Sequence, residues 1–176
     1  MYDTVDKFKS YLYGKTYIAF GDSWTFPRGT ASSLSTITYP TYIGNRTGLS
    51  VLNYGKSSST VADRSAYDPK YIESADENLC KLHEIVSSDI SAADFITFAY
   101  GINDQSVIKN NGEKTSIELS TTWGAWNNVL SNIYTWNPDV KLGIIINDTV
   151  GSVQLNLQKE IAKWWGIPVL DLRNDI

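Results

Sequence analysis

The chain has 176 residues, of which 42% are hydrophobic, a size and composition typical of one globular domain with a sizeable core. Its net charge of -4 provides no basic field for a phosphate backbone, which argues against nucleic acid as a partner. A single cysteine and a single histidine exclude an internal disulfide and a cysteine- or histidine-rich metal site, so we expect neither a metal nor a cofactor.

The N-terminal segment carries acidic residues where a secretory leader has basic ones, and no long apolar stretch precedes the first predicted strand. No window approaches the roughly 20 apolar residues that a membrane-spanning helix needs. We therefore expect neither a signal peptide nor a transmembrane segment in this chain. The compartment is left open.

Residues 16–20 form a short apolar run that predicts the first strand, and this run ends in Gly21-Asp22-Ser23. A serine at the sharp exit of a buried strand is lifted above the sheet, where a nucleophile meets its ligand. Ser23 is therefore the candidate nucleophile; the alternative is a serine that caps the following segment. Trp24 places an aromatic ring at the mouth of this site and is a candidate substrate contact.

Residues 24–35 are rich in serine and threonine and predict a loop, which a short helix at residues 39–47 follows. Residues 50–54 predict the second strand, and Gly55 comes directly after it. Gly55 offers a backbone N–H at the strand end, although a glycine in this place is more often a simple turn residue.

Residues 56–70 predict a second loop, and residues 75–87 predict a helix that contains His83. A side chain on this helix packs beside the sheet or meets solvent, so we expect no catalytic part for His83. Residues 94–100 predict the third strand, and Asn103 follows it as a candidate amide donor, with a turn or cap role as the alternative.

The second half of the chain, like the first, alternates between predicted strands and predicted helices. Residues 107–114 predict a loop and residues 115–136 a long helix. Residues 140–146 predict the fourth strand, residues 152–165 another helix, and residues 167–170 the fifth strand.

This alternation is typical of βαβ units, and the right-handed crossover rule then gives a parallel sheet. We predict an α/β fold: a three-layer α/β/α sandwich with a five-stranded parallel sheet, flavodoxin-like, with helices on both faces and strands buried on both faces. Residues 1–176 form a single domain in this prediction. Such sheets carry their sites at the carboxyl ends of the strands, where Ser23, Gly55 and Asn103 fall.

Acyl transfer builds negative charge on a carbonyl oxygen, and one preorganised donor at that oxygen contributes about 10²–10³ in rate. The N–H of Ser23, the N–H of Gly55 and the amide of Asn103 are expected to converge there. A serine hydroxyl also needs a neighbouring base to take its proton. The three strand ends therefore predict a site for acyl transfer.

The sequence resembles the SGNH hydrolases, the GDSL-like lipases and esterases, in three of the four sequence blocks of that family. Ser23 stands as nucleophile in FGDSW, Gly55 in NYGKSSST, and Asn103 as oxyanion donor in YGINDQ. The later segments IIIND and GIPVLDLRN also fit, so the resemblance covers residues 16–174. It implies hydrolysis of small acyl esters, either carbohydrate O-acetyl esters or lipid esters.

The fourth block of the family, an Asp-x-x-His after the last strand, is not present in this sequence. The resemblance implies that its aspartate orients the histidine and that the histidine activates the serine, so neither role falls to a residue of this chain. We expect a C-terminally truncated domain that lacks a final loop and helix of roughly 20–30 residues.

Two functional hypotheses follow. In the first, the domain is an ester hydrolase that forms an acyl-enzyme on Ser23 and acts on a small-molecule ester or an acylated carbohydrate. In the second, which the absent histidine motivates, it is a catalytically inactive carbohydrate-binding module of a larger surface or phage protein. A receiver or nucleotide-binding domain shares the architecture, but the sequence has no GxGxxG loop and no suitably placed late lysine.

Overall fold

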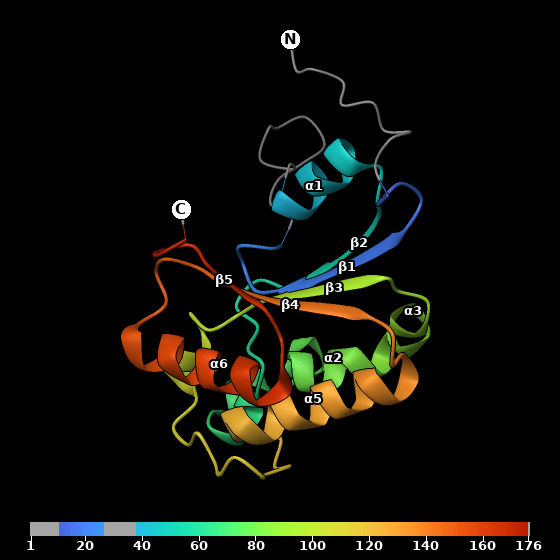
Figure 1. Cartoon of the computed structure of the whole chain (residues 1–176). Coiled ribbons are helices and arrows are strands. Elements are labelled where there is room, and N and C mark those ends of the chain that lie inside the picture. Colours follow the sequence, from blue (N-terminus) through green and yellow to red (C-terminus); the bar gives the residue numbers. More distant parts are fainter. Residues whose placement is uncertain (1–10, 27–37, 176) are drawn as a thin grey trace.

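The computed structural model describes residues 11–26 and 38–175, which contain one sheet of five parallel strands in the order β2-β1-β3-β4-β5 (Figure 1). The strands are β1 (Thr16–Gly21), β2 (Ser50–Gly55), β3 (Phe95–Ala99), β4 (Lys141–Ile146) and β5 (Val169–Asp171). This is the flavodoxin-like strand order, and it confirms the predicted five-stranded parallel sheet. Gly21, at the end of β1, is level with Gly55 on one side and Ala99 on the other.

Helices cover both faces of the sheet, as predicted, but unequally (Figure 1). One face carries α2 (Leu79–Ile85), α3 (Ser87–Ser91), α5 (Thr122–Trp136) and α6 (Ser152–Trp165); the other carries α1 (Tyr39–Thr47). The short helix α4 (Asp104–Val107) follows β3, and three 3-10 turns, η3 (Arg64–Ala66), η4 (Pro69–Tyr71) and η5 (Ala75–Glu77), lie between β2 and α2. No helix in the described part of the chain has the length and apolar character needed to cross a membrane.

The main hydrophobic core lies between the sheet and the layer of α5 and α6. Phe20 and Phe98 stack with ring centroids 5.9 Å apart, and Trp126 of α5 meets Phe98 edge-on at 5.4 Å. All three rings are fully buried. Because burying one large apolar side chain stabilises the fold by roughly 1.5–3 kcal/mol, this layer supports the strands that carry the site.

The opposite face of the sheet is covered differently along its width. Side chains on a strand alternate between the two faces, so Thr97 of β3, Ile145 of β4 and Leu170 of β5 point to the α1 side. Thr97 and Ile145 are half-buried, and Leu170 is 44% exposed. The expectation of strands buried on both faces therefore holds on the α5 side and, among the described residues, only in part on the α1 side.

Three predicted elements, two helices and the fifth strand, have clearly different boundaries in the structure. The helix expected at residues 75–87 is divided into η5, α2 and α3. Asn78 is extended between η5 and α2, and its side-chain oxygen accepts a hydrogen bond from the Thr60 hydroxyl at 2.9 Å. The fifth strand, expected at residues 167–170, begins instead at Val169, directly after Pro168.

The helix expected at residues 115–136 begins at Thr122. Thr121 caps it, because the Thr121 hydroxyl oxygen accepts a hydrogen bond from the Gly124 N–H at 3.1 Å. The backbone of Glu118 lies against the first turn, where a Cβ on Gly124 would fall 2.1 Å from the Glu118 carbonyl oxygen. Residues 115–121 therefore pack as a non-helical segment across the start of α5.

Candidate active site

Ser23 lies in a tight turn that directly follows β1. The Asp22 carbonyl oxygen accepts hydrogen bonds from the N–H groups of Thr25 and Phe26, both at 3.0 Å. The Asp22 carboxylate accepts one from the Trp24 N–H, also at 3.0 Å. Among the described residues, neither the hydroxyl nor the N–H of Ser23 has a hydrogen-bond partner, so both groups are available to a ligand and Ser23 is not a cap. The rest of the loop predicted at residues 24–35 lies outside the described residues.

Gly55 ends β2 beside this serine turn. A Cβ on Gly55 would fall 2.6 Å from the Phe26 nitrogen and 2.6 Å from the Thr25 carbonyl carbon, both backbone atoms. A side chain at position 55 would therefore push the serine turn away from the sheet. The Gly55 N–H donates to Asn53 Oδ1 at 2.9 Å, a bond with which a substrate oxyanion would compete.

Asn103 follows β3 and reaches the same end of the sheet. Its Nδ2 donates to the Ser59 carbonyl oxygen at 2.9 Å, while the Ser59 hydroxyl donates to the carbonyl oxygen of Lys56 at 2.8 Å and to that of Gly21 at 3.4 Å. Ser59 thus ties together the segments that carry Asn103, Gly55 and the serine turn. Because an amide has two N–H donors, the bond to Ser59 orients Asn103 and leaves one donor for a ligand.

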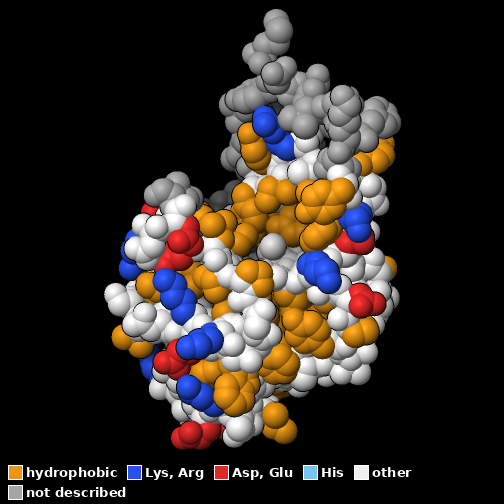
Figure 2. All heavy atoms as spheres, in the orientation of Figure 1, with side chains coloured by type: hydrophobic (Ala, Val, Ile, Leu, Met, Phe, Trp, Pro, Cys, Tyr) orange, Lys and Arg blue, Asp and Glu red, His pale blue; other side chains and the backbone are white. Residues whose placement is uncertain are grey.

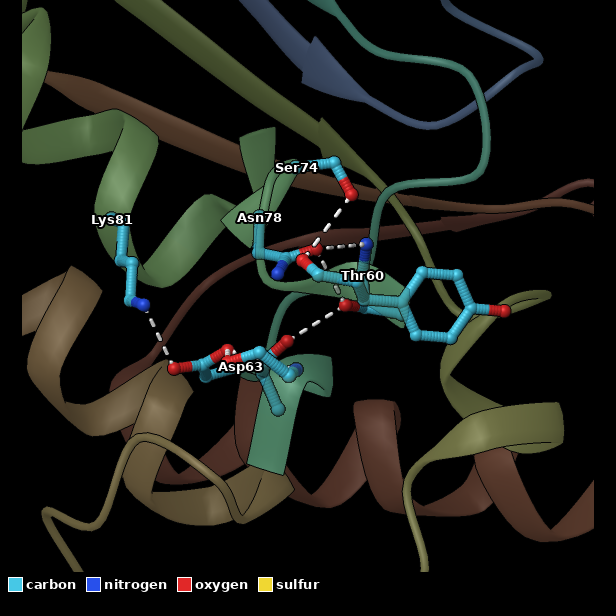
Figure 3. A network of polar contacts seen from close by, with 8 residues as sticks. Thr60, Asp63, Ser74, Asn78 and Lys81 are labelled. Carbon is cyan, nitrogen blue, oxygen red and sulfur yellow. Dashed lines mark hydrogen bonds and ion pairs between the residues drawn. The ribbon is translucent and has the colours of Figure 1, made fainter. Parts of the chain in front are cut away.

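A polar network holds the loop between β2 and α2 in place (Figure 3). Thr60, the residue after Ser59, donates to Asn78 Oδ1 at 2.9 Å. The ammonium group of Lys81 lies 2.9 Å from the Asp63 carboxylate and joins α2 to the same loop. Sequence reasoning missed Ser59 and this network, since a polar loop sequence does not show which carbonyl will meet Asn103.

Asp104, the residue that follows Asn103 in the sequence, has a fully buried carboxyl group. One oxygen accepts a hydrogen bond from the Val61 N–H at 2.9 Å, and the other has no hydrogen-bond partner among the described residues. Burial raises the pKa of Asp104 to about 7; the Val61 and Ala62 N–H groups lower it, and the neighbouring Asp22 carboxylate raises it. The Asp104 carboxyl is thus protonated in mildly acidic solution.

Asp104 makes the stability of the protein depend on pH. Its folded pKa lies above the ordinary value of 3.8, so the folded state binds the extra proton and unfolding becomes easier as pH rises from about 4 to about 7. Asp104→Asn keeps the acceptor for Val61 and should flatten this dependence, which is about 2–4 kcal/mol. Urea unfolding at pH 5 and pH 8 measures it. The exposed Asp148→Asn is the control, and an equal slope in Asp104→Asn would contradict the assignment.

A pocket of about 720 Å³ opens beside Ser23 on the α1 side of the sheet, and this volume is within the usual range for small-molecule sites. Figure 2 shows hydrophobic side chains gathered around a hollow next to α1. Trp24, 55% exposed, lines this pocket, which places the predicted substrate contact beside the candidate nucleophile. Gly55 and Asn103 do not line the pocket; they lie at the ends of the strands on either side of β1.

Several residues of the pocket were not singled out from the sequence. They come from α1, from the α1 side of β4 and β5, and from the segment after β5: Tyr39, Ile43, Ile145, Leu170 and Leu172. Alternation along the strands could have indicated Ile145 and Leu170 as neighbours on one face. No sequence feature indicates that this face lies open beside Ser23.

No protein-family model and no curated protein matches the sequence. Solved structures do match. A candidate GDSL-like lipase from Bacteroides uniformis has a TM-score of 0.69 at 17% identity, over 90% of this chain and 84% of that one. A carbohydrate acetylesterase family member from Sinorhizobium meliloti has a TM-score of 0.59 at 18% identity, over 90% and 83%. An esterase of the SGNH-hydrolase family has a TM-score of 0.54 at 14% identity, over 89% and 75%.

The chain has the SGNH-hydrolase fold. The agreement confirms the fold that the three sequence blocks implied. In this SGNH-hydrolase fold the serine turn follows the first strand of the sheet, and the candidate glycine and asparagine follow the strands on either side of it.

The single histidine lies away from these strand ends, as expected. His83 is fully buried on α2, its Nδ1 3.0 Å from the Leu79 carbonyl oxygen and its Nε2 3.1 Å from the Asn132 amide nitrogen. Because a carbonyl can only accept, Nδ1 carries the proton and Nε2 accepts from Asn132. Burial lowers the pKa of His83 and favours this neutral form. Both ring nitrogens of His83 are therefore hydrogen-bonded to residues of α2 and α5.

Proposed function

We propose that this protein acts on carboxylic esters through Ser23. The observation that carries the proposal is a serine whose hydroxyl and N–H have no partner among the described residues, in a tight turn that borders an apolar pocket. The named activities of the structural neighbours, a GDSL-like lipase and a carbohydrate acetylesterase family member, support the same reaction class.

The reaction has two steps. The Ser23 oxygen attacks the ester carbonyl carbon, its proton passes to a base, and the alcohol leaves; water then cleaves the acyl-Ser23 ester. The N–H of Ser23 and the free amide hydrogen of Asn103 stabilise the oxyanion, and the Gly55 N–H joins them when it gives up Asn53. The base is not a histidine of this sequence, since His83 is buried in the helical layer.

The test is an assay on p-nitrophenyl acetate with this chain and with a version extended past Ile176. We expect slow acetylation of Ser23 in this chain, detected by peptide mass spectrometry, because p-nitrophenyl acetate is an activated ester and solvent water can take up the proton of the Ser23 hydroxyl. In the extended version, a residue that takes up the Ser23 proton would give hydrolysis above the buffer rate. Neither adduct nor hydrolysis in both proteins would count against an ester hydrolase.

A second candidate function is a catalytically inactive carbohydrate-binding module. It is favoured by one observation: within this sequence no histidine reaches Ser23. The exposed ring of Trp24 beside the pocket is also suited to stacking on a sugar face. An acylated oligosaccharide that binds this chain and Ser23→Ala equally, and is not cleaved by either protein, would support it.

A further inference from the structure

The pocket beside Ser23 extends across the sheet rather than into it. Its lining runs from Ser23 after β1, past Ala99 at the end of β3 and Ile145 in β4, to Leu170 in β5. These strands are consecutive neighbours in the sheet, so the lining spans three strand spacings, about 14 Å. The pocket is therefore long in one direction and begins at the candidate nucleophile.

The lining is mostly apolar. Trp24 and Phe26 form the side near the serine turn, Tyr39 and Ile43 the α1 side, and Leu172 borders the β5 end. None of the described residues that line the pocket carries a charge, and the few polar groups include Ser23 and Asn147.

Tyr39 adds no free polar group to this lining. Its hydroxyl lies 3.3 Å from the Thr25 hydroxyl, and burial raises its pKa, so the ring stays neutral and bound to the protein. A sugar ring would leave several of its hydroxyl groups without partners in such a pocket, at a cost of about 1–3 kcal/mol for each. A hydrocarbon chain has no hydrogen-bonding groups to leave unpaired there, and its transfer from water into the pocket lowers the free energy.

We propose that this pocket binds the acyl chain of a medium-chain ester, with the carbonyl carbon at Ser23 and the methyl end at Leu170. An extended chain of about ten carbons matches the three strand spacings. The position of the carbonyl carbon rests on the proposed function. The inference goes further, because it selects medium-chain acyl esters over acetyl esters as the substrate class.

Two measurements on this chain test the pocket, one of them independent of turnover. The first is binding of alkyl methyl ketones, from methyl ethyl ketone to methyl nonyl ketone, followed by calorimetry and by Trp24 fluorescence. These ketones carry a carbonyl group but no ester bond. We expect affinity to rise about fourfold with each added methylene until the pocket is full. The second is the rate of Ser23 acylation by p-nitrophenyl acetate, hexanoate and decanoate, which should rise in the same order.

Leu170→Gln tests the far end of the pocket. This side chain is 44% exposed and glutamine has a similar length, so we expect the variant to fold, and a melting curve checks this. We expect the ratio of nonyl-ketone to ethyl-ketone affinity to fall about tenfold. Ile117→Gln is the matched control, because Ile117 is 78% exposed and lies outside the pocket lining; its ketone series should equal that of the unchanged chain.

The outcomes separate the two proposals. Ketone binding that rises with chain length, with neither an adduct on Ser23 nor hydrolysis in this chain or in the extended version, keeps the acyl pocket and removes the ester hydrolase. Acylation that is equally fast with acetate and decanoate, together with a flat ketone series, overturns the acyl pocket and leaves the hydrolase. A concentration-dependent dimer in sizing experiments that Leu170→Gln dissociates would assign this face to a second copy of the chain, and would also overturn the inference.

Discussion

Ser23→Ala is expected to eliminate the acetylated form of the protein and to lower ester turnover by about 10³-fold or more in any version that turns over. The acyl group needs the Ser23 oxygen, and alanine leaves only the oxyanion donors and the pocket. The measurements are the mass of the tryptic peptide after p-nitrophenyl acetate treatment and the rate of p-nitrophenol release. Stability should change by less than about 0.5 kcal/mol, because the Ser23 hydroxyl has no hydrogen-bond partner among the described residues.

Ser57→Ala is the matched control, an exposed serine in the loop after β2. It should keep the wild-type adduct and rate. An adduct that persists in Ser23→Ala, on any residue, would mean that another nucleophile reacts and would remove Ser23 from the mechanism. A large loss of stability in Ser23→Ala would show instead that its hydroxyl supports the serine turn.

The strands and the three candidate residues could be predicted because each depends on short-range sequence features. A buried parallel strand needs a continuous apolar run, and the chain can leave it only through small or polar residues. Ser23, Gly55 and Asn103 were found at such exits, and parallel pairing of the strands then brought the exits to one edge. Only the structure shows why position 55 must be a glycine: the backbone of the serine turn lies too close for a side chain.

The features that could not be predicted depend on contacts between residues far apart in the sequence. The helix break at Asn78 goes with a hydrogen bond to Thr60, and Ser59 orients Asn103 from 44 residues away. Apolar runs also could not show how much of each face is covered. Ile145 and Leu170 are as apolar as residues of the core, yet they border a pocket on the α1 side. Burial on that side depends on which elements pack over the sheet, a property that no single strand encodes.

Asn103→Asp is expected to lower the rate constant for ester turnover or Ser23 acylation by about 10²–10³-fold, with little change in the concentration of ester at half-maximal rate. The substitution keeps the size of the side chain but replaces the N–H donor with a carboxylate oxygen, which repels a developing oxyanion. It also removes the hydrogen bond to the Ser59 carbonyl, so we expect a loss of about 1–3 kcal/mol in unfolding free energy. Stopped-flow acylation and urea unfolding measure the two effects separately.

Gln105→Glu provides the matched amide-to-acid control in α4. Its Oε1 accepts the Gly151 N–H at 2.6 Å, a bond that a carboxylate can retain, and the residue is exposed. This variant should keep both rate and stability. If folded Asn103→Asp acylates as fast as the unchanged chain while losing stability, Asn103 only anchors the loop through Ser59. Only the N–H groups of Ser23 and Gly55 would then stabilise the oxyanion. The Gly55 N–H would have to break its hydrogen bond to Asn53 Oδ1 during the reaction.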